Sequence, residues 1–192
     1  MLTTITFLKD YRCFKQGEVL KLDTGNSLIL VGDQGTGKSS IFNLMNHLNE
    51  YKEIAVVDYR GPRQTRFFDT EKMNPRTQNS FGISKVDFAV SLFGTFSSHG
   101  QTMLPIMTAK DLLNNPEPMM LIVDEPESGL SLQSQFKLLA YYQEALKRGH
   151  YVTIATHSPI LMKLNDQVYD VANRKTVSAN DYIRSIVGNL LG

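Results

Sequence analysis

Alternating apolar and polar positions mark the first third of the chain. Residues 2–8 and 13–22 alternate in this way around a short turn, a pattern that predicts a β-hairpin. The apolar run at residues 27–31 predicts a strand, and residues 39–48 place apolar side chains at helical spacing. A further strand is expected at residues 53–59. The pattern therefore predicts a hairpin followed by strand, loop, helix and strand.

The central part of the chain is less regular. Residues 60–84 are rich in Arg, Gly, Pro, Asn and Thr and show neither period, so we expect an irregular or partly helical insertion. A helix is expected to resume near Lys85, and another to begin near Gln101 and end before Pro116. Residues 119–123 are continuously apolar, which is typical of a parallel strand buried on both faces.

A helix and a strand follow this buried strand. Ser131 is expected to open the helix, and Gly149 to lie just past its end, before a strand at residues 151–155. The apolar residues expected on the inward face of the helix are Leu132, Phe136, Leu139, Tyr142 and Leu146.

An amphipathic helix is expected at residues 178–192, near the end of the chain. Its apolar stripe consists of Tyr182, Ile183, Ile186, Val187, Leu190 and Leu191. We expect this stripe to pack against the same domain, with docking of a partner protein as the alternative.

The alternation of strands and helices indicates an α/β fold with a mostly parallel central sheet and an N-terminal antiparallel portion. With 192 residues and 42% hydrophobic content, the chain has room for one ordinary domain and a small lobe. We therefore expect a single domain over residues 1–192, with a helical lobe inserted at about residues 60–115.

Composition limits the classes of partner. The formal net charge of +1 provides no global field toward nucleic acid or an anionic membrane. Positive charge does gather in the insertion, at Arg60, Arg63, Arg66, Lys72, Arg76 and Lys85. This group is interpreted either as a patch for DNA, RNA or an acidic protein or as an ordinary solvated loop.

Cysteine usage and hydropathy favour the cytoplasm. The single cysteine, Cys13, excludes an internal disulfide and is expected to be a small buried hydrophobic residue in a reducing compartment. No apolar run is long enough to span a bilayer, and the N-terminus lacks the basic segment of a secretory signal. We therefore expect a cytoplasmic protein without a membrane partner.

A glycine-rich motif lies between the first predicted helix and the strand before it. Residues 32–39 match the phosphate-loop pattern G-x-x-x-x-G-K-[ST] in the strand, loop, helix context that the pattern requires. Its glycines let backbone N–H groups surround phosphate oxygens, and the helix N-terminus adds positive potential. Lys38 is expected to contact the β- and γ-phosphates, and Ser39 to offer its hydroxyl to Mg²⁺. The residues expected to surround the nucleotide are Gly32, Asp33, Gln34, Gly35, Thr36, Gly37, Lys38, Ser39, Ser40 and Arg12.

Acidic and imidazole groups end two of the later predicted strands. Asp124 and Glu125 fall at the carboxyl edge of the sheet, where ligands of open α/β folds bind. Asp124 is expected to hold Mg²⁺, and Glu125 to accept a proton from the water that attacks the γ-phosphate. His157 is expected at the same edge, where it can donate to the γ-phosphate. The alternatives are acids that cap the next helix and an ordinary loop histidine.

These motifs, with Phe-Ser-Ser-His-Gly-Gln at residues 96–101 and Ser-Gly-Leu-Ser at residues 128–131, resemble the ABC ATPase family over about residues 5–160. The resemblance implies a P-loop NTPase fold of the ABC type, Mg²⁺-dependent hydrolysis of ATP to ADP and phosphate, and an ATP-dependent homodimer. It implies that the signature motif, which contacts the γ-phosphate held by the opposite subunit, consists of Ser98, His99, Gly100 and Gln101. It implies that the D-loop at the dimer interface consists of Ser128, Gly129, Leu130 and Ser131.

Some positions are less well defined by the resemblance. His99 stands where most relatives have glycine, which would strain the loop or weaken the signature contact. The family also has a glutamine that couples Mg²⁺ to the partner-facing lobe, and Gln64 is the first candidate, with Gln78 as the second. The expected catalytic residues are thus Lys38, Gln64, Glu125 and His157, and the expected Mg²⁺ ligands are Ser39, Gln64 and Asp124. Tyr11 and Phe14 are the candidates for stacking on adenine.

Within the family, residues 8–14 are similar to the opening of the RecF, SMC and double-strand-break-repair branch. A dimer that closes on ATP and reopens after hydrolysis would act as a timer or motor for another molecule. One use is ATP-gated DNA maintenance or defence, and the other is a regulatory ATPase subunit whose effector is a separate protein. A nucleotide kinase or a GTPase is disfavoured by the paired acids and His157, and a GTPase would also carry an Asn-Lys-x-Asp motif that this sequence lacks.

Overall fold

The computed structural model describes residues 2–23, 25–47, 49–62, 64–69 and 113–191. Several predictions fall outside these ranges, namely the helices near Lys85 and Gln101, the signature residues 98–101 and Gln78. The elements of the described chain are β1 (Leu2–Phe7), β2 (Val19–Asp23), β3 (Ser27–Val31), α1 (Lys38–Asn46), β4 (Ala55–Arg60), β5 (Gln64–Asp69), β6 (Met119–Asp124), α5 (Leu132–Lys147), β7 (Tyr151–Ala155), the 3₁₀ helix η1 (Leu161–Leu164), β8 (Gln167–Asp170), β9 (Lys175–Ser178) and α6 (Ala179–Leu191).

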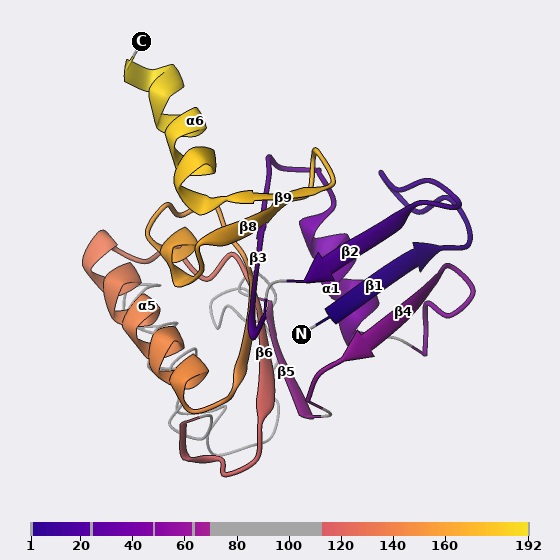
Figure 1. Ribbon diagram of the computed structural model, residues 1–192, viewed down its shortest axis with the longest axis horizontal. Helices are drawn as coiled ribbons and strands as arrows, with labels where there is room; N and C mark the ends of the chain where they lie inside the picture. The colour runs from indigo at the N-terminus through magenta and orange to yellow at the C-terminus, as the bar shows by residue number, and fades with distance from the viewer. Residues whose placement is uncertain (1, 24, 48, 63, 70–112, 192) are drawn as a thin grey trace, which may run out of the picture.

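Two sheets organise the described chain (Figure 1). The smaller sheet is antiparallel, in the order β2-β1-β4, and the larger has the order β5-β6-β7-β3-β8-β9. In the larger sheet β5, β6, β7, β3 and β8 run parallel, and β9 pairs antiparallel with β8. The predicted α/β class, with a mostly parallel central sheet and an N-terminal antiparallel portion, is confirmed. The parallel strands bring their carboxyl ends to one edge.

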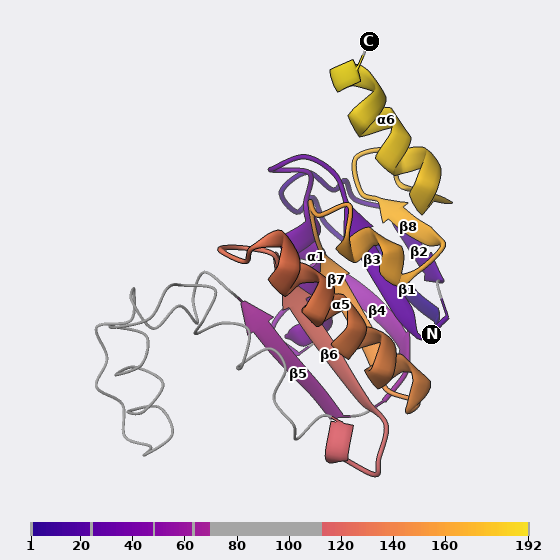
Figure 2. The same cartoon turned by 90° about the vertical axis from the view of Figure 1, so that its left-hand side faces the viewer.

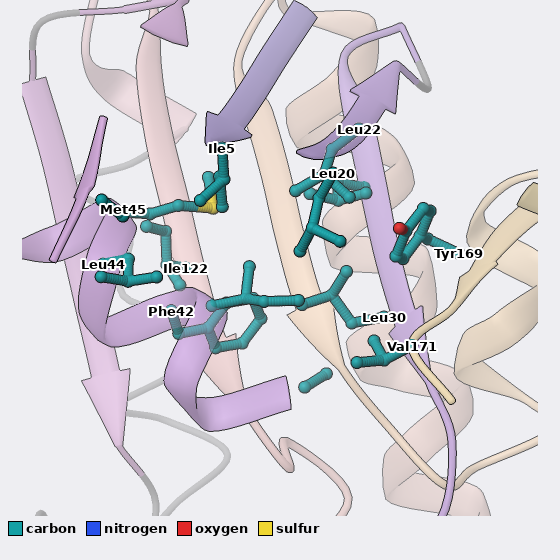
Figure 3. Packing of buried hydrophobic residues seen from close by; sticks show 14 of the residues in the cluster. Ile5, Leu20, Leu22, Leu30, Phe42, Leu44, Met45, Ile122, Tyr169 and Val171 are labelled. Carbon is teal, nitrogen blue, oxygen red and sulfur yellow. The ribbon is translucent and has the colours of Figure 1, made fainter. Parts of the chain in front are cut away.

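Alternate residues of the central strands face two hydrophobic cores. In β6, Leu121 and Val123 contribute to the core beneath α5, whereas Met120 and Ile122 contribute to the core around α1. Figure 1 shows α5 on one side of the larger sheet and α1 with the small sheet on the other. In the second core, the ring of Phe42 lies among side chains from both sheets (Figure 3). Because both faces are covered, β6 is a continuous apolar run instead of an alternating one.

The strand β5 corrects the prediction of an irregular segment from residue 60 onward. Its residues pair in parallel with β6, from Gln64 opposite Met119 to Asp69 opposite Asp124. Among the described strands, β5 lies at the edge of the larger sheet. Its sequence contains polar, charged and aromatic residues. An edge strand does not need a continuous apolar run, so the pattern of hydrophobic positions did not reveal it.

The ends of α5 match the prediction, and so do three of the five residues predicted on its inward face, namely Leu139, Tyr142 and Leu146. Ser131 caps the helix by accepting a hydrogen bond from a backbone N–H in the first turn, and Gly149 has a left-handed φ of +86° beyond the last turn. Leu132 and Phe136 are 68% and 59% exposed and do not face the core. The buried residues that the pattern did not predict are Gln135, Leu138 and Ala145. Gln135 was missed because the sequence pattern assigned only apolar residues to the inward face.

The C-terminal region extends the larger sheet before it forms the predicted helix. The hairpin of β8 and β9 was not predicted, since its strands have only four residues each. In α6, Tyr182 and Ile183 pack against the core beneath α5, whereas Ile186 is 40% exposed. The helix projects away from the sheets in both views (Figures 1 and 2). The expected packing of the apolar stripe therefore holds for its first turn.

Candidate functional site

The glycine-rich loop joins β3 to α1, and its backbone geometry requires glycine. Gly32, Gly35 and Gly37 have φ values of +136°, +83° and +106°, a region that side chains rarely adopt. A Cβ atom on Gly37 would also lie 2.6 Å from Sγ of Cys13 and 2.7 Å from Cζ of Phe14. The loop can therefore pass this close to its neighbours only with glycine at position 37.

Lys38 begins α1, and its ammonium group lies inside the loop. The side chain is buried, and Nζ donates hydrogen bonds to the carbonyl oxygens of Gly32 at 2.8 Å and Asp33 at 3.1 Å. Burial lowers the pKa of Lys38, while the carboxylates of Glu125 and Asp124 act in the opposite direction. The ammonium group is thus held between the loop and the acids after β6. Phosphate oxygens can replace the two carbonyl oxygens as stronger, charged acceptors.

The N-terminus of α1 is open to an anion. Among the described residues it has no side-chain cap, and its first turn contains no acidic residue. Its free backbone N–H groups and its dipole therefore favour a bound anion at this end. Ser39 is exposed there, whereas Ser40 is buried and accepts a hydrogen bond of 3.2 Å from Nη1 of Arg12. Arg12 is thus attached to the first turn of α1 through Ser40. Its expected contact with the nucleotide stays a prediction.

The carboxyl ends of β6 and β7 bring the predicted acids and histidine together. Asp124 pairs in register with Ala155, and the backbone N–H of Glu125 donates to the Ala155 carbonyl at 2.9 Å. Nε2 of His157 lies 3.6 Å from Oε1 of Glu125. Glu125 has a left-handed φ of +48°, which is uncommon for a residue with a side chain and is concentrated at functional sites.

A third acid, Glu127, belongs to the same cluster and was missed by the sequence analysis. Its Oε2 accepts a hydrogen bond of 2.7 Å from the Thr156 hydroxyl, and its Oε1 accepts one of 2.5 Å from the His157 backbone N–H. The signal was weak because an acid in a loop is ordinarily solvated. Its partners follow 29 and 30 positions later, and only the pairing of β6 with β7 brings them close.

The segment predicted as a D-loop forms a turn between β6 and α5. The Ser128 backbone N–H donates to the Glu125 carbonyl at 3.0 Å, and the Leu130 N–H donates to the Glu127 carbonyl at 2.9 Å. Leu130 is buried, and Ser131 begins the cap of α5. The turn is therefore attached directly to the two glutamates of the site.

Comparison with known proteins gives distant relatives along most of the chain. No family model matches. The macrolide export ATP-binding/permease protein MacB of Hahella chejuensis is 21% identical over 200 residues, which cover 83% of this chain and 30% of MacB. An uncharacterised ABC transporter ATP-binding protein of Bacillus subtilis, YvrO, is 24% identical over 92% of this chain and 96% of its own length. The chain thus spans less than a third of MacB but nearly the whole length of YvrO.

Solved structures share the architecture. The ATP-binding cassette MJ0796, in a dimeric post-hydrolysis state bound to ADP and Pi, has a TM-score of 0.55 at 13% identity and covers 93% of this chain and 99% of its own. A bacterial Atm1-family ABC exporter with ATP bound has a TM-score of 0.57 at 16% identity and covers 96% of this chain and 40% of its own. The chain has the fold of an ABC ATPase domain. The sequence relatives are ATP-binding proteins of ABC transporters and support the same family.

The relatives differ from the branch that residues 8–14 indicated. MacB and YvrO carry the names of transporter ATP-binding proteins, and these names do not support a place for this chain in the RecF and SMC branch. Within the part of the chain that the structure describes, no helix has both the length and the apolar character needed to cross a membrane. The comparisons therefore support the ABC family without supporting the branch.

The structure corrects the assignment of Gln64 to the catalytic and metal-binding set. Gln64 begins β5, whereas Asp69 at the carboxyl end of the strand pairs with Asp124. Because a strand rises about 3.3 Å per residue, Gln64 lies about 16 Å from the site edge, and it accepts a hydrogen bond of 3.4 Å from Asn115. Parallel strands present their site residues after the carboxyl end, so the second candidate, Gln78, is better placed along the chain but lies outside the described residues.

Two expectations about residues before the loop also change. Cys13 is exposed, and its Sγ donates a hydrogen bond of 3.1 Å to the carbonyl of Thr36 in the phosphate loop. Phe14 is fully buried, and its ring stacks on Phe7 with the centroids 4.5 Å apart. Phe14 therefore cannot stack on adenine. Tyr11 is only partly buried and stays the candidate for that role.

The oxygen donors of the site fit Mg²⁺ bound together with a nucleotide. Ser39 has a hydroxyl at the start of α1, and Asp124 has a carboxylate at the end of β6. In the described ranges there is no group of three or more His, Cys, Asp or Glu side chains that could hold a metal by itself. Mg²⁺ in nucleotide sites takes one or two protein oxygens and completes its shell with phosphate and water. The small donor set therefore suits Mg²⁺ that arrives with a polyphosphate.

Proposed function

We propose that this chain binds Mg²⁺-ATP and hydrolyses it to ADP and phosphate. The proposal rests on one observation: the phosphate loop lies next to the acids at the end of β6. There the carboxylates of Glu125 and Asp124 interact electrostatically with buried Lys38, and Nε2 of His157 lies 3.6 Å from Oε1 of Glu125. An ammonium group inside an anion-binding loop, opposite a carboxylate at a strand end, is the arrangement that phosphoryl transfer to water requires.

The residues of the loop bind and orient the triphosphate. The backbone N–H groups at the start of α1 and the ammonium group of Lys38 contact the phosphate oxygens. Ser39 and Asp124 hold Mg²⁺, which supplies neutralisation of the charge that develops on the phosphates. Positioning and electrostatic stabilisation by these groups account for most of the expected rate, because phosphoryl transfer needs little covalent chemistry from the protein.

Glu125 and His157 act on the attacking water and on the γ-phosphate. The Glu125 carboxylate accepts the proton of the water, a role that a metal-bound Asp124 cannot take. His157 donates a hydrogen bond to the γ-phosphate from the neighbouring strand end. The left-handed backbone of Glu125 ends β6 and begins the loop that carries Glu127.

The site is completed by a second copy of the chain. Residues 98–101 are expected to form the signature that reaches the γ-phosphate of the opposite subunit, and residues 128–131 the D-loop between the subunits. Support comes from the solved cassette, which is described as dimeric and bound to ADP and Pi. In this arrangement ATP closes the dimer, and hydrolysis reopens it.

The effector of this cycle is a separate protein. The named functions of MacB and YvrO, an ATP-binding/permease protein and an ABC transporter ATP-binding protein, favour an ATPase subunit that drives a partner, and a membrane permease is one partner of this kind. DNA maintenance or defence has weaker support, because it depends on residues 8–14 and on basic residues that lie mostly outside the described ranges. Stimulation of the ATPase by DNA, lost steeply with salt, would reverse this preference.

The central experiment measures ATP binding and hydrolysis by the purified chain and by Glu125→Gln. We expect the variant to bind Mg²⁺-ATP normally, to hydrolyse it at least about 100-fold more slowly, and to accumulate as a dimer in size-exclusion chromatography with Mg²⁺-ATP. Glu144→Gln is the matched control, since Glu144 is a surface carboxylate paired with Arg148 at 2.8 Å. Equal rates for Glu125→Gln and the wild-type chain would refute the base, and failure of the wild-type chain to bind ATP would refute the function.

A further inference from the structure

Glu127 fastens the loop after β7 to the loop after β6. Each of its carboxylate oxygens accepts one hydrogen bond, Oε2 from the Thr156 hydroxyl at 2.7 Å and Oε1 from the His157 backbone N–H at 2.5 Å. A carboxylate that accepts two hydrogen bonds from adjacent residues fixes both the position and the direction of that backbone. The residue that it fixes, His157, is the one expected to contact the γ-phosphate.

Thr156 connects this clamp to the strand that leads into the phosphate loop. It is fully buried, and its backbone N–H donates to the Leu30 carbonyl at 3.1 Å. Its hydroxyl donates to Glu127 and at the same time accepts a hydrogen bond of 3.0 Å from the Ser158 backbone N–H. This hydroxyl therefore donates one hydrogen bond and accepts another, which together favour one orientation of its O–H bond.

A second buried link joins the same two loops. The Ser158 hydroxyl donates to Oε1 of Gln135 at 2.6 Å, and Nε2 of Gln135 donates to the Leu130 carbonyl at 3.2 Å. Gln135 and Ser158 are both buried. Because this link does not involve Glu127, it holds the loops together when Glu127 is altered, and a variant of Glu127 should keep its fold.

The imidazole of His157 depends on the clamp because little else restrains it. Its side chain is 46% exposed, and Nε2 of the ring lies 3.6 Å from Oε1 of Glu125. Glu127 therefore positions His157 through the hydrogen bond that it accepts from the His157 backbone N–H. A displacement of about 1 Å in a catalytic group can lower a rate by about 100-fold.

We propose that Glu127 is a positioning residue, which places His157 against Glu125 and against the γ-phosphate. This inference rests on the proposed ATPase function. The Glu127 carbonyl also accepts the Leu130 N–H at 2.9 Å, so the same residue carries the D-loop turn on its backbone and His157 on its side chain. A movement of the D-loop at a dimer interface would thus be passed to the His157 backbone through Glu127, in addition to the link from Leu130 through Gln135 to Ser158.

The chemistry of the clamp explains why a carboxylate is needed. Both partners of Glu127 are donors: one is the His157 backbone N–H, and the other is the Thr156 hydroxyl, which also accepts from the Ser158 N–H. A glutamine at this position would offer one acceptor and one donor group, which leaves one of the two donors without an acceptor. Glu127→Gln should therefore disturb the clamp nearly as much as Glu127→Ala.

The first test measures steady-state ATP hydrolysis and equilibrium ATP binding. For Glu127→Ala we expect kcat to fall about 10- to 100-fold, while the Kd for Mg²⁺-ATP changes less than about twofold, because both carboxylate oxygens of Glu127 are engaged by Thr156 and the His157 backbone N–H. In the His157→Ala background the same substitution should change kcat less than twofold, since Glu127 acts through His157. An equal loss of kcat in both backgrounds would overturn the proposal.

Substitutions of Thr156 provide an independent variant of the clamp. Thr156→Ser keeps the hydroxyl and should retain the wild-type kcat, whereas Thr156→Val has nearly the same shape without the hydroxyl and should lower kcat about 3- to 10-fold, a part of the effect expected for a displaced catalytic group. Glu144→Ala, which removes an exposed carboxylate from α5, serves as the control and should leave kcat unchanged. A lower kcat for Thr156→Ser than for Thr156→Val would contradict the clamp.

A readout without ATP separates this proposal from the proposed function. The chain has 4 histidines, and the imidazole signals in a ¹H–¹⁵N spectrum can be assigned to His157 by comparison with His157→Ala. We expect the His157 signal to shift or broaden in Glu127→Ala and to stay in place in Glu144→Ala. An unchanged His157 signal in Glu127→Ala refutes the clamp even if the chain is an active ATPase. A shifted signal supports the clamp even if the wild-type chain hydrolyses no ATP.

Discussion

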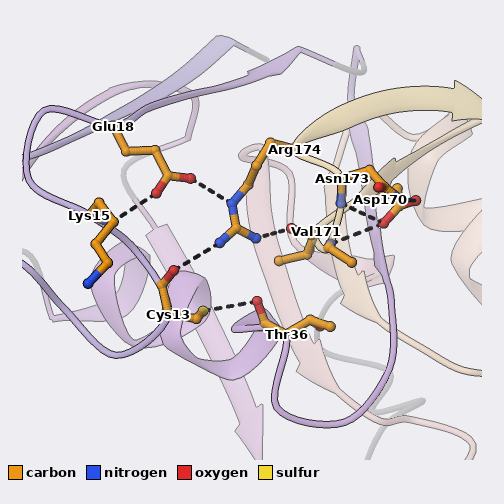
Figure 4. Close-up of polar contacts among 9 residues, drawn as sticks. Cys13, Lys15, Glu18, Thr36, Asp170, Val171, Asn173 and Arg174 are labelled. Atoms are coloured by element: carbon orange, nitrogen blue, oxygen red, sulfur yellow. Dashed lines mark hydrogen bonds and ion pairs between the residues drawn. The ribbon is translucent and has the colours of Figure 1, made fainter.

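Arg174 ties the turn between β8 and β9 to the N-terminal hairpin (Figure 4). Its Nε donates to Oε1 of Glu18 at 2.6 Å, Nη2 donates to the Cys13 carbonyl at 3.2 Å, and Nη1 donates to the Val171 carbonyl. The guanidinium carbon also lies 4.4 Å from the ring centroid of Phe14. The substitution Arg174→Met keeps an unbranched side chain but removes all four interactions.

The expected loss of stability follows from these contacts. A hydrogen bond to a charged group contributes about 1.5–3 kcal/mol, and a cation–π contact at a partly exposed site about 0.5–1 kcal/mol. The side chains of Arg174 and Glu18 are 27% and 22% exposed, so water replaces some of the lost bonds, and methionine keeps some packing. We therefore expect the free energy of unfolding to fall by about 2–4 kcal/mol. In a domain of this size that corresponds to a Tm lower by about 5–12 °C.

Thermal and urea denaturation followed by circular dichroism would measure this loss. Arg184→Met is the control, because Arg184 and Asp181 form a pair 3.8 Å apart with side chains 83% and 73% exposed, and pairs of this kind contribute little. A double-mutant cycle of Arg174→Met with Glu18→Gln should show a coupling above about 1 kcal/mol. A loss below about 0.5 kcal/mol, or no coupling, would refute the view that this link holds the two parts together.

Three further predictions follow from single contacts. Gly37→Ala should weaken Mg²⁺-ATP binding at least about tenfold, because the new Cβ clashes with Cys13 and Phe14 at a φ of +106°. The control is Gly149→Ala, where φ is +86° and the new Cβ has no atom within 4 Å. This control should reduce stability but leave ATP binding intact. Burial lowers the pKa of His150, so the unfolded chain takes up a proton first, and stability measured by denaturation should decline as the pH falls below about 6.5, less so in His150→Gln. The Tyr142 hydroxyl is buried and has no hydrogen-bond partner among the described residues; Tyr142→Phe should raise the free energy of unfolding by about 1 kcal/mol, and a decrease would show that the hydroxyl has a partner.

Local patterns were sufficient for the phosphate loop and the strands around it. The sequence alone identified the Gly-x-x-x-x-Gly-Lys-Ser motif and the apolar strands at residues 27–31, 119–123 and 151–155. It also identified the polar residues that follow these strands. These features depend on neighbours within a few positions, because glycine geometry, strand periodicity and helix capping are properties of short segments. Asp124, Glu125 and His157 could be identified for the same reason, since each lies at the end of a buried strand or within two residues of it.

Contacts between distant segments decided the remaining features. β5 is a strand because it pairs with β6, and this pairing moved Gln64 to the end of the sheet away from the site. At the start of α5, Leu132 and Phe136 lie outside, whereas Gln135 is buried and forms hydrogen bonds with Leu130 and Ser158. A side chain's role in such cases depends on partners far away in the sequence, and neither period nor propensity encodes them.

Glu127 illustrates the division most clearly. Read along the chain, it is one acid among several in a polar loop, and its neighbours do not distinguish it. In the fold, the parallel pairing of β6 with β7 places its carboxylate against two donors that follow 29 and 30 residues later. Short-range rules established the phosphate-binding half of the site, and strand pairing across the sheet assembled the half that faces it, because hydrogen bonds between distant loops form only after the backbone has brought those loops together.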